Sequence, residues 1–308
     1  MSILLFPGQG SQKACMGNTF FFQDNDCVSR IDLISDLLKL DFESILKSKD
    51  PSVYSKTRYS QLILFFYQYS MARTISKIDL VAAHSMGEFA AIAVANVLSF
   101  EDVLNLVNKR ALFTNEICER VPSRMAAIVG MMNSQVEFEL ASIRSEGFQV
   151  YVANYNGDGQ LVITGCKEGI RKAVSVFKVL GAKRAVILPI SGSFHSPLMT
   201  SANDKLIEEI DKLSFKDSEI PIIQSFSGRS TMDSNRIKEN LKRHLISGVK
   251  WTDAMQELAK YEGTDMVEIG PDETLTKMLR RVNDKLLLRS VWQGDNMSNF
   301  VETEFLKN

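Results

Sequence analysis

The sequence predicts an α/β protein in which helices cover both faces of a mainly parallel sheet, with a small second unit inserted into it. Short apolar runs of strand length alternate with helical patterns towards both ends of the chain, as is typical of parallel sheets. Between them, residues 124–190 follow the order strand, helix, strand, strand, helix, strand. A length of 308 residues fits one large domain with a smaller one.

The elements of the larger unit follow from its apolar runs and from the residues that end them. Residues 2–6 predict a buried strand, which the Pro-Gly turn directly after it ends. A second strand is expected at 79–83, where it stops abruptly before an Ala-rich helix. Ser99, with an acidic residue three positions on, is a capping-box-like start for a helix over 99–117. The other expected elements are helices at 30–48, 59–77 and 273–282 and a strand within 265–271.

The inserted unit is marked by a hairpin signal. Asn-Gly and Asp-Gly in residues 156–159 predict a tight turn between strands at 148–155 and 160–165, because these dipeptides tolerate positive φ. Its other elements are strands at 124–131 and 184–190 and helices at 134–143 and 167–181. This order is that of a ferredoxin-like unit. We expect it to form a subdomain at 124–190, inside a discontinuous larger domain at 1–123 and 191–308.

The composition argues against several classes of function. A net charge of −1 gives no electrostatic basis for binding nucleic acid. The chain has only three histidines, its four cysteines are scattered, and no zinc-ligand spacing occurs, so we expect no metal site. No apolar run is long enough for a membrane span, and the N-terminus lacks the pattern of a secretory leader. We expect a cytoplasmic protein.

Ser85 is the candidate nucleophile. It lies in the pentapeptide Ala-His-Ser-Met-Gly at 83–87, close to the G-x-S-x-G pattern of a nucleophile elbow. The S-x-G part alone is common, since Ser145 also has it, and an ordinary turn serine remains an alternative. The motif requires a strand, a sharp turn and a helix. Only the stretch around Ser85 has that context.

The three histidines differ in their suitability as a base for this serine. His84 is adjacent in sequence, and an adjacent residue on such a turn normally points away, so a packed structural role is expected. His244 lies in a basic helical stretch and is expected at the surface. His195 follows a strand in an irregular loop, where an α/β fold usually keeps its base. His195 is therefore the candidate.

Arg110 is the candidate binding residue because it lies on the apolar stripe of the helix predicted at 99–117. A guanidinium on a buried face costs several kcal/mol, of the order of 5, unless something pairs with it. One interpretation is a structural ion pair with an internal Asp or Glu. The other is a cation that awaits an anionic substrate, for which the planar fork of Arg suits a carboxylate. Serine, histidine and arginine together indicate acyl transfer from a substrate with a free carboxylate.

Six stretches occur in the order found in malonyl-CoA:acyl-carrier-protein transacylases, and on them the chain resembles that family over nearly its whole length. They are LLFPGQGSQ (4–12), AHSMGEFAA (83–91), KRALF (109–113), NYNGDGQLVITG (154–165), GAKRAVILPISGSFHSPLM (181–199) and VEIGP (267–271). The resemblance implies an α/β-hydrolase-like domain with an inserted ferredoxin-like subdomain. It also implies that Ser85 is the nucleophile, His195 its base and Arg110 the ligand of the malonyl carboxylate. The backbone N–H groups of Gln9 and Met86 would form the oxyanion hole.

The resemblance also implies finer features. The family orients its histidine through a backbone carbonyl, which by position would come from the GVKWTD stretch, near Lys250. Phe194 resembles the malonyl-selective members, since a large residue there leaves little room for an α-methyl branch. Ala83 departs from the family, which usually has glycine at this point of the elbow.

The implied reaction is a ping-pong transfer of malonyl from malonyl-CoA, through a malonyl-serine ester, to the phosphopantetheine thiol of an acyl carrier protein in fatty-acid or polyketide synthesis. It needs no metal or resident cofactor, and a monomer is expected. An acyl hydrolase of the same fold and a catalytically inactive carrier-protein docking module are the alternatives. Because carrier proteins are acidic, a basic docking surface is expected. Its candidates are Lys172, Lys178, Lys183 and Arg184, although an ordinary solvated helix face is the simpler explanation of these charges.

Overall fold

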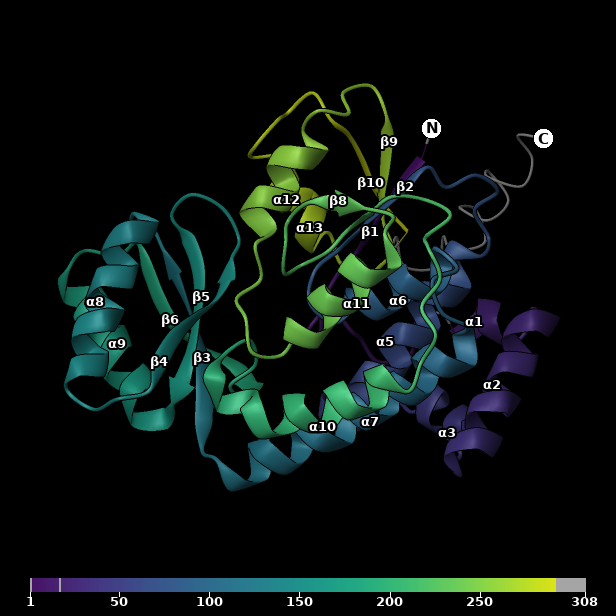
Figure 1. Cartoon of the computed structure of the whole chain (residues 1–308), viewed down its shortest axis with the longest axis horizontal. Coiled ribbons are helices and arrows are strands. Elements are labelled where there is room, and N and C mark those ends of the chain that lie inside the picture. The colour runs from purple at the N-terminus through teal and green to yellow at the C-terminus, as the bar shows by residue number, and fades with distance from the viewer. Residues whose placement is uncertain (1, 17, 292–308) are drawn as a thin grey trace.

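The computed structural model describes residues 2–16 and 18–291, which form two sheets with helices packed on them (Figure 1). The strands are β1 Ser2–Phe6, β2 Leu80–Ala83, β3 Ser123–Val129, β4 Val150–Tyr155, β5 Gln160–Cys166, β6 Arg184–Ser191, β7 Ile222–Ile223, β8 Ser230–Thr231, β9 Asp265–Glu268 and β10 Leu287–Ser290. The helices are α1 Asn18–Phe21, α2 Asn25–Leu38, α3 Phe42–Lys47, α4 Pro51–Ser55, α5 Thr57–Ala72, α6 Gly87–Val94, α7 Phe100–Arg120, α8 Asn133–Ser145, α9 Lys167–Val179, the 3₁₀ helix Pro197–Met199, α10 Thr200–Asp211, α11 Ser234–Arg243, α12 Trp251–Leu258 and α13 Thr274–Leu279.

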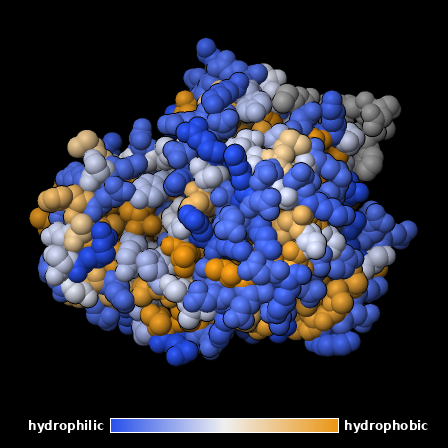
Figure 2. All heavy atoms as spheres, viewed as in Figure 1, coloured by the Kyte–Doolittle hydropathy of each residue, from blue (hydrophilic) through white to orange (hydrophobic). Residues whose placement is uncertain are grey.

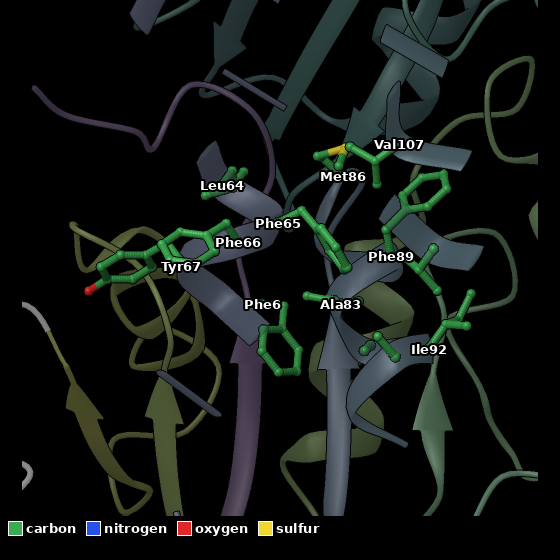
Figure 3. Close-up of a cluster of buried hydrophobic side chains, with 14 of the residues drawn as sticks. Phe6, Leu64, Phe65, Phe66, Tyr67, Ala83, Met86, Phe89, Ile92 and Val107 are labelled. Atoms are coloured by element: carbon green, nitrogen blue, oxygen red, sulfur yellow. The ribbon is translucent and has the colours of Figure 1, made fainter. Parts of the chain in front are cut away.

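The larger sheet has the strand order β10-β9-β1-β2-β7-β8, and every pair is parallel except β7–β8. Successive side chains of β1 point to opposite faces, and both faces are buried. Leu4 and Phe6 join the core beneath α5, α6 and α7, part of which Figure 3 shows. Ile3 and Leu5 join a second core with residues of α12 and α13. The predicted parallel sheet with helices on both faces is therefore confirmed.

The smaller sheet is antiparallel, with the strand order β4-β5-β3-β6. Helices α8 and α9 pack on one of its faces around a core of their own. The element order β3, α8, β4, β5, α9, β6 is the predicted ferredoxin-like order, and β4 and β5 form the predicted hairpin. The division into domains at residues 124 and 190 stays a prediction, and residues 292–308 of the larger predicted domain lie outside the described residues.

Two predicted helices differ from the structure. The helix expected at 30–48 is two helices, because Lys39 takes a left-handed conformation with φ 50° that ends α2. Asp41 then caps α3 by accepting a hydrogen bond from the N–H of Ser44. The helix expected at 59–77 is α5, which ends at Ala72.

Backbone hydrogen bonds join β4 of the smaller sheet to the segment between α11 and α12 of the larger unit. The N–H of Tyr155 donates to the carbonyl of Val249, and the N–H of Val249 donates to the carbonyl of Ala153, both over 2.9 Å. The chain after α11 is thus held against β4. Figure 2 shows that hydrophilic side chains cover most of one face of the molecule, with smaller apolar groups between them. Among the described residues, no helix is both long and apolar enough to cross a membrane.

Candidate active site

Ser85 occupies the predicted sharp turn between β2 and α6. Its φ is 52°, a left-handed value that costs a non-glycine residue energy and is typical of strained functional turns. The turn depends on Gly87, since a Cβ there would lie 2.2 Å from the carbonyl oxygen of Phe6. Only glycine lets α6 approach β1 so closely. Ala83, in place of the family's usual glycine, is fully buried at the end of β2.

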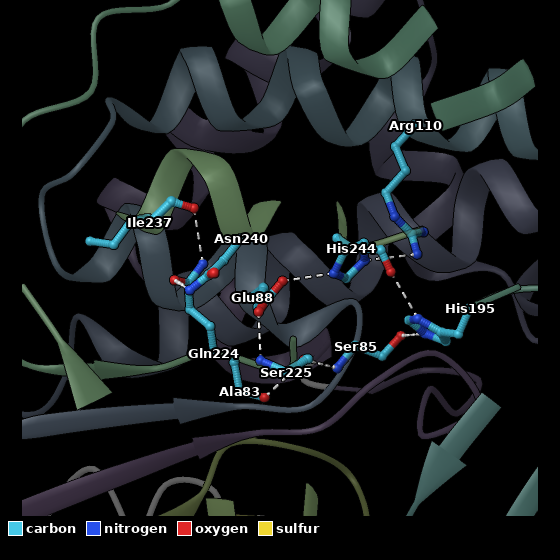
Figure 4. A network of polar contacts seen from close by, with 10 residues as sticks. All are labelled: Ala83, Ser85, Glu88, Arg110, His195, Gln224, Ser225, Ile237, Asn240 and His244. Atoms are coloured by element: carbon cyan, nitrogen blue, oxygen red, sulfur yellow. Dashed lines mark hydrogen bonds and ion pairs between the residues drawn. The ribbon is translucent and has the colours of Figure 1, made fainter. Parts of the chain in front are cut away.

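Ser225 and Glu88 hold this turn from behind (Figure 4). The Ser225 hydroxyl accepts a 2.7 Å hydrogen bond from the N–H of Ser85 and donates over 3.1 Å to the carbonyl of Ala83. The N–H of Ser225 donates over 2.6 Å to Oε1 of Glu88. Both side chains are buried, so every polar atom of the turn that they contact is satisfied without water.

His195 is placed to act as a base on Ser85. Its Nε2 lies 2.7 Å from the Ser85 hydroxyl oxygen, and its Nδ1 lies 2.9 Å from the carbonyl oxygen of His244. Because a carbonyl only accepts, Nδ1 carries the hydrogen and Nε2 has a free lone pair for the serine proton. Burial lowers the pKa of His195 well below its usual 6.5, and the neighbouring His244 and Arg110 lower it further. The imidazole is therefore neutral at neutral pH and competent to take a proton.

The prediction that the orienting carbonyl lies near Lys250 is wrong. The Lys250 carbonyl accepts from the N–H of Ala254, because α12 begins at Trp251 and uses it for its first turn. The Lys250 ammonium instead lies 5.4 Å from the ring centre of Phe226. The carbonyl of His244 takes the orienting role, directly after α11.

The prediction of a surface position for His244 is also wrong. Its neighbours Lys242 and Arg243 reach solvent, but His244 itself turns inward and is 2% exposed. Its Nδ1 lies 2.7 Å from Oε2 of Glu88. The sequence shows only a basic stretch, because the acid that attracts this histidine lies on α6, far away in the chain.

Arg110 lies on the buried face of α7, as predicted, and is 1% exposed. Its Nη2 is 3.2 Å from Nε2 of His244, while Nε and Nη1 have no hydrogen-bond partner among the described residues. Within that part of the chain Arg110 forms no direct ion pair with a carboxylate, and Glu88 reaches it only through the His244 imidazole. Burial lowers its pKa to about 10, which leaves it charged at neutral pH. Two unpartnered donors on a buried cation suit an anionic ligand.

His84 has the structural role expected of it. Its Nε2 lies 3.0 Å from Oδ1 of Asn156, and its ring meets Trp251 edge-on. Burial lowers the pKa of His84 as well. A hydrogen bond to the turn after β4 therefore explains this histidine without a part in proton transfer.

A cavity of about 270 Å³ joins these groups and lies between the two sheets. Ser85, Arg110, His195 and Phe194 line it together with the turn after β1 and apolar side chains of the smaller sheet. That turn packs on the elbow, since a Cβ at Gly8 would lie 3.1 Å from the Cβ of Ser85. The remaining lining residues include Gln9, Met125, Asn154, Val162, Leu188, Ile190 and Met278.

Among the backbone N–H groups near Ser85, those of Gln9 and Met86 have no acceptor within the described part of the chain. The described residues also contain no cluster of three or more histidine, cysteine, aspartate or glutamate side chains that could hold a metal ion. The site brings together a serine, a neutral imidazole, a buried cation and backbone donors.

Comparison with known proteins agrees with this arrangement. The family model described as acyl transferase domain matches residues 3–297. The chain belongs to this family. The malonyl CoA-acyl carrier protein transacylase of Bacillus subtilis is 32% identical over 303 residues, which cover 97% of this chain and 96% of the relative.

Solved structures extend the likeness to the whole fold. The acyl-carrier-protein-S-malonyltransferase of Bartonella henselae is 28% identical with a TM-score of 0.89, over 99% of both chains. A malonyl-transacylase in complex with its type II polyketide acyl carrier protein is 27% identical with a TM-score of 0.89, over 100% of this chain and 99% of that one. The α/β-hydrolase-like core with a small subdomain is therefore the fold of this acyl transferase domain.

Sequence reasoning missed three buried groups of this acyl transferase domain: Glu88, Ser225 and the side chain of His244. Glu88 carried a signal, since it is the one acidic residue in the otherwise apolar stretch 86–95. Burial raises its pKa to about 8, which the N–H of Ser225 and the charge of Arg110 oppose. Ser225 had no such signal. Its contact with the Ser85 N–H depends on the pairing of β7, the strand just before it, with β2.

Proposed function

We propose that this acyl transferase domain transfers a malonyl group from malonyl-CoA to the phosphopantetheine thiol of an acyl carrier protein. The observation that carries the proposal is the meeting, in one cavity, of a Ser85–His195 contact and a buried Arg110 with two unpartnered donors. The first is the machinery of acyl transfer, and the second suits the carboxylate that distinguishes malonyl from acetyl. Relatives named malonyl transacylases support the same reaction.

In the first half-reaction, the Ser85 oxygen attacks the thioester carbonyl carbon while Nε2 of His195 takes the hydroxyl proton. The free N–H groups of Gln9 and Met86 stabilise the oxyanion that forms. When the carbon–sulfur bond breaks, the imidazolium returns its proton to the CoA sulfur. The products are the malonyl-serine ester and free CoA.

In the second half-reaction, Arg110 holds the malonyl carboxylate while the carrier-protein thiol attacks the ester carbonyl. His195 takes the thiol proton and delivers it to the serine oxygen as the carbon–oxygen bond breaks. The neutral imidazole suits both steps, since it must be unprotonated at the start of each.

Arg110 favours transfer over hydrolysis, and the Ser85–His195 contact favours it over an inactive docking module. A hydrolase of this fold has no need of a carboxylate ligand, whereas the ester must be held until the thiol arrives. A catalytically inactive docking module has no need of a 2.7 Å contact between Ser85 and His195. Phe194 is 5% exposed, with its ring centre 5.7 Å from the Arg110 guanidinium, so it supports a preference for unbranched malonyl.

We further propose an acidic carrier protein as partner, with a monomeric enzyme working in the cytoplasm. Lys178, Lys183 and Arg184 are exposed, whereas Lys172 pairs with Glu146. The exposed three are the better candidates for docking. Arg184 begins β6, and Leu188 and Ile190 of the same strand line the cavity, which supports docking on this side of it.

The test is the mass of a holo carrier protein after incubation with malonyl-CoA and the enzyme, beside the Ser85→Ala variant. We expect a malonylated carrier protein with the native enzyme and none above background with the variant. Release of CoA without malonylation of the carrier would indicate a hydrolase. Neither product would indicate a docking module.

A further inference from the structure

Three buried ionisable side chains form a chain of contacts behind the cavity (Figure 4). Glu88 comes from α6, Arg110 from α7, and His244 from the turn after α11. The His244 imidazole lies between the other two, with Nδ1 2.7 Å from Oε2 of Glu88 and Nε2 3.2 Å from Nη2 of Arg110. The reaction as described above uses the backbone carbonyl of His244 but assigns no role to this side chain.

Only one arrangement of protons satisfies all of these contacts. The other oxygen of Glu88 accepts from the N–H of Ser225, so an ionised Glu88 accepts at both oxygens. The Nδ1 of His244 must then donate to Glu88. A guanidinium has donors only, so Nε2 of His244 must accept from Arg110. The imidazole is therefore neutral with its hydrogen on Nδ1, and burial agrees by lowering the pKa of His244 well below its usual range.

This tautomer has a consequence for Arg110. A guanidinium is planar, so a hydrogen bond at Nη2 limits its rotation about the side-chain axis. The unpartnered Nε and Nη1 are then fixed in direction as well. The rings of Phe89 and Phe194, each with its centre 5.7 Å from the guanidinium carbon, restrict the remaining movement.

We propose that the His244 imidazole is a positioning residue for substrate selection: held by Glu88, it fixes the guanidinium of Arg110 to receive the carboxylate of the acyl group. This inference rests on the proposed function of Arg110. It separates the two parts of His244, since the carbonyl orients His195 whereas the side chain orients Arg110. Substitution of the side chain leaves the carbonyl in place.

The experiment measures kcat and KM for acylation of Ser85 by malonyl-CoA and by acetyl-CoA, at a pH above about 8 so that Glu88 is ionised. In His244→Leu, which has no acceptor for Arg110, we expect kcat/KM for malonyl-CoA to fall roughly 10- to 100-fold, mainly through KM. Any effect of the substitution on His195 falls on both substrates, so the readout is the ratio of kcat/KM for malonyl-CoA to kcat/KM for acetyl-CoA, and we expect this ratio to fall at least about tenfold.

Two further variants separate a positioning role from a merely structural one. His244→Gln offers an amide oxygen to Arg110 and an amide N–H to Glu88, so it should restore most of the malonyl preference. Glu88→Gln must keep its oxygen towards the N–H of Ser225 and so presents its NH₂ to Nδ1 of His244. The imidazole hydrogen then moves to Nε2, where it opposes Arg110, and we expect a loss of malonyl preference like that of His244→Leu.

A folded His244→Leu variant that keeps the malonyl-to-acetyl ratio would overturn the inference. So would equal losses for both substrates, which would indicate an effect through His195 alone. If the leucine variant does not fold, equal ratios in His244→Gln and Glu88→Gln overturn it. The ¹⁵N spectrum of histidine-labelled native protein, recorded at the same pH as the kinetics, decides independently of any variant, since a hydrogen on Nε2 of His244 contradicts the arrangement. A native enzyme that forms no malonyl-serine ester would instead refute the proposed function.

Discussion

The replacement of Arg110 by alanine bears most directly on the choice of substrate. The native guanidinium is buried, keeps its charge and has two donors without partners. If these donors bind the malonyl carboxylate, the variant loses one or two charge-assisted hydrogen bonds, each worth about 1.5–3 kcal/mol. The carboxylate also enters a buried site without a counterion, which is costly in itself.

A loss of about 3 kcal/mol corresponds to a fall of roughly 150-fold in kcat/KM for malonyl-CoA. Acetyl-CoA has no carboxylate, so its acylation rate should stay within about threefold of the native rate. Arg110→Lys is the matched control, because it keeps the charge. A single ammonium cannot hold both His244 and a carboxylate in the native geometry. We therefore expect kcat/KM of the lysine variant for malonyl-CoA to lie between the values of the native enzyme and the alanine variant.

The assay is rapid quenching followed by intact-mass measurement of acylated Ser85, with thermal melting to show that each variant is folded. Equal falls for malonyl-CoA and acetyl-CoA would refute the assignment, since they would place Arg110 in the common machinery. An unchanged malonyl rate would refute it too, because the two free donors would then have no ligand.

Four other predictions concern the elbow, the base and the cavity. Gly87→Ala should cost about 3 kcal/mol of unfolding free energy in a denaturant titration, because its Cβ would meet the backbone of Phe6 at 2.2 Å; an unchanged midpoint would contradict this. Ser225→Ala leaves the buried N–H of Ser85 without an acceptor, so it should cost about 1–3 kcal/mol and slow acylation, whereas a native rate would show that the elbow needs no such support. Since only neutral His195 is active and its pKa is lowered, the rate of acylation by acetyl-CoA, which does not use Arg110, should stay constant as pH falls through 6.5 and decline only at more acidic pH; a midpoint at 6.5 would contradict the burial effect. Phe194→Ala should raise the use of methylmalonyl-CoA relative to malonyl-CoA about tenfold in competition, and an unchanged ratio would remove Phe194 from substrate selection.

The sequence predicts those parts of the site that local patterns determine. A short apolar run before Ser85 and an Ala-rich helix after it suffice to indicate the elbow, and helical periodicity suffices to place Arg110 on a buried face. The hairpin of the smaller sheet follows from its turn residues. In each case the residues that decide the structure are neighbours in the chain.

The groups that sequence reasoning missed depend on contacts between distant segments. His244 is buried because Glu88, 156 positions away, accepts its hydrogen. The orienting carbonyl differs from the predicted one by a few positions, because the start of α12 decides which carbonyls are already used. The break at Lys39 is likewise invisible to periodicity, since a left-handed lysine has no composition signal.

The most direct test of the central claim is the intact mass of the pure protein after brief exposure to malonyl-CoA, beside acetyl-CoA and the Ser85→Ala variant. The account predicts a malonyl ester that maps to Ser85, a much weaker acetyl adduct, and no adduct in the variant. An adduct on another residue, or equal malonyl and acetyl adducts, would contradict it.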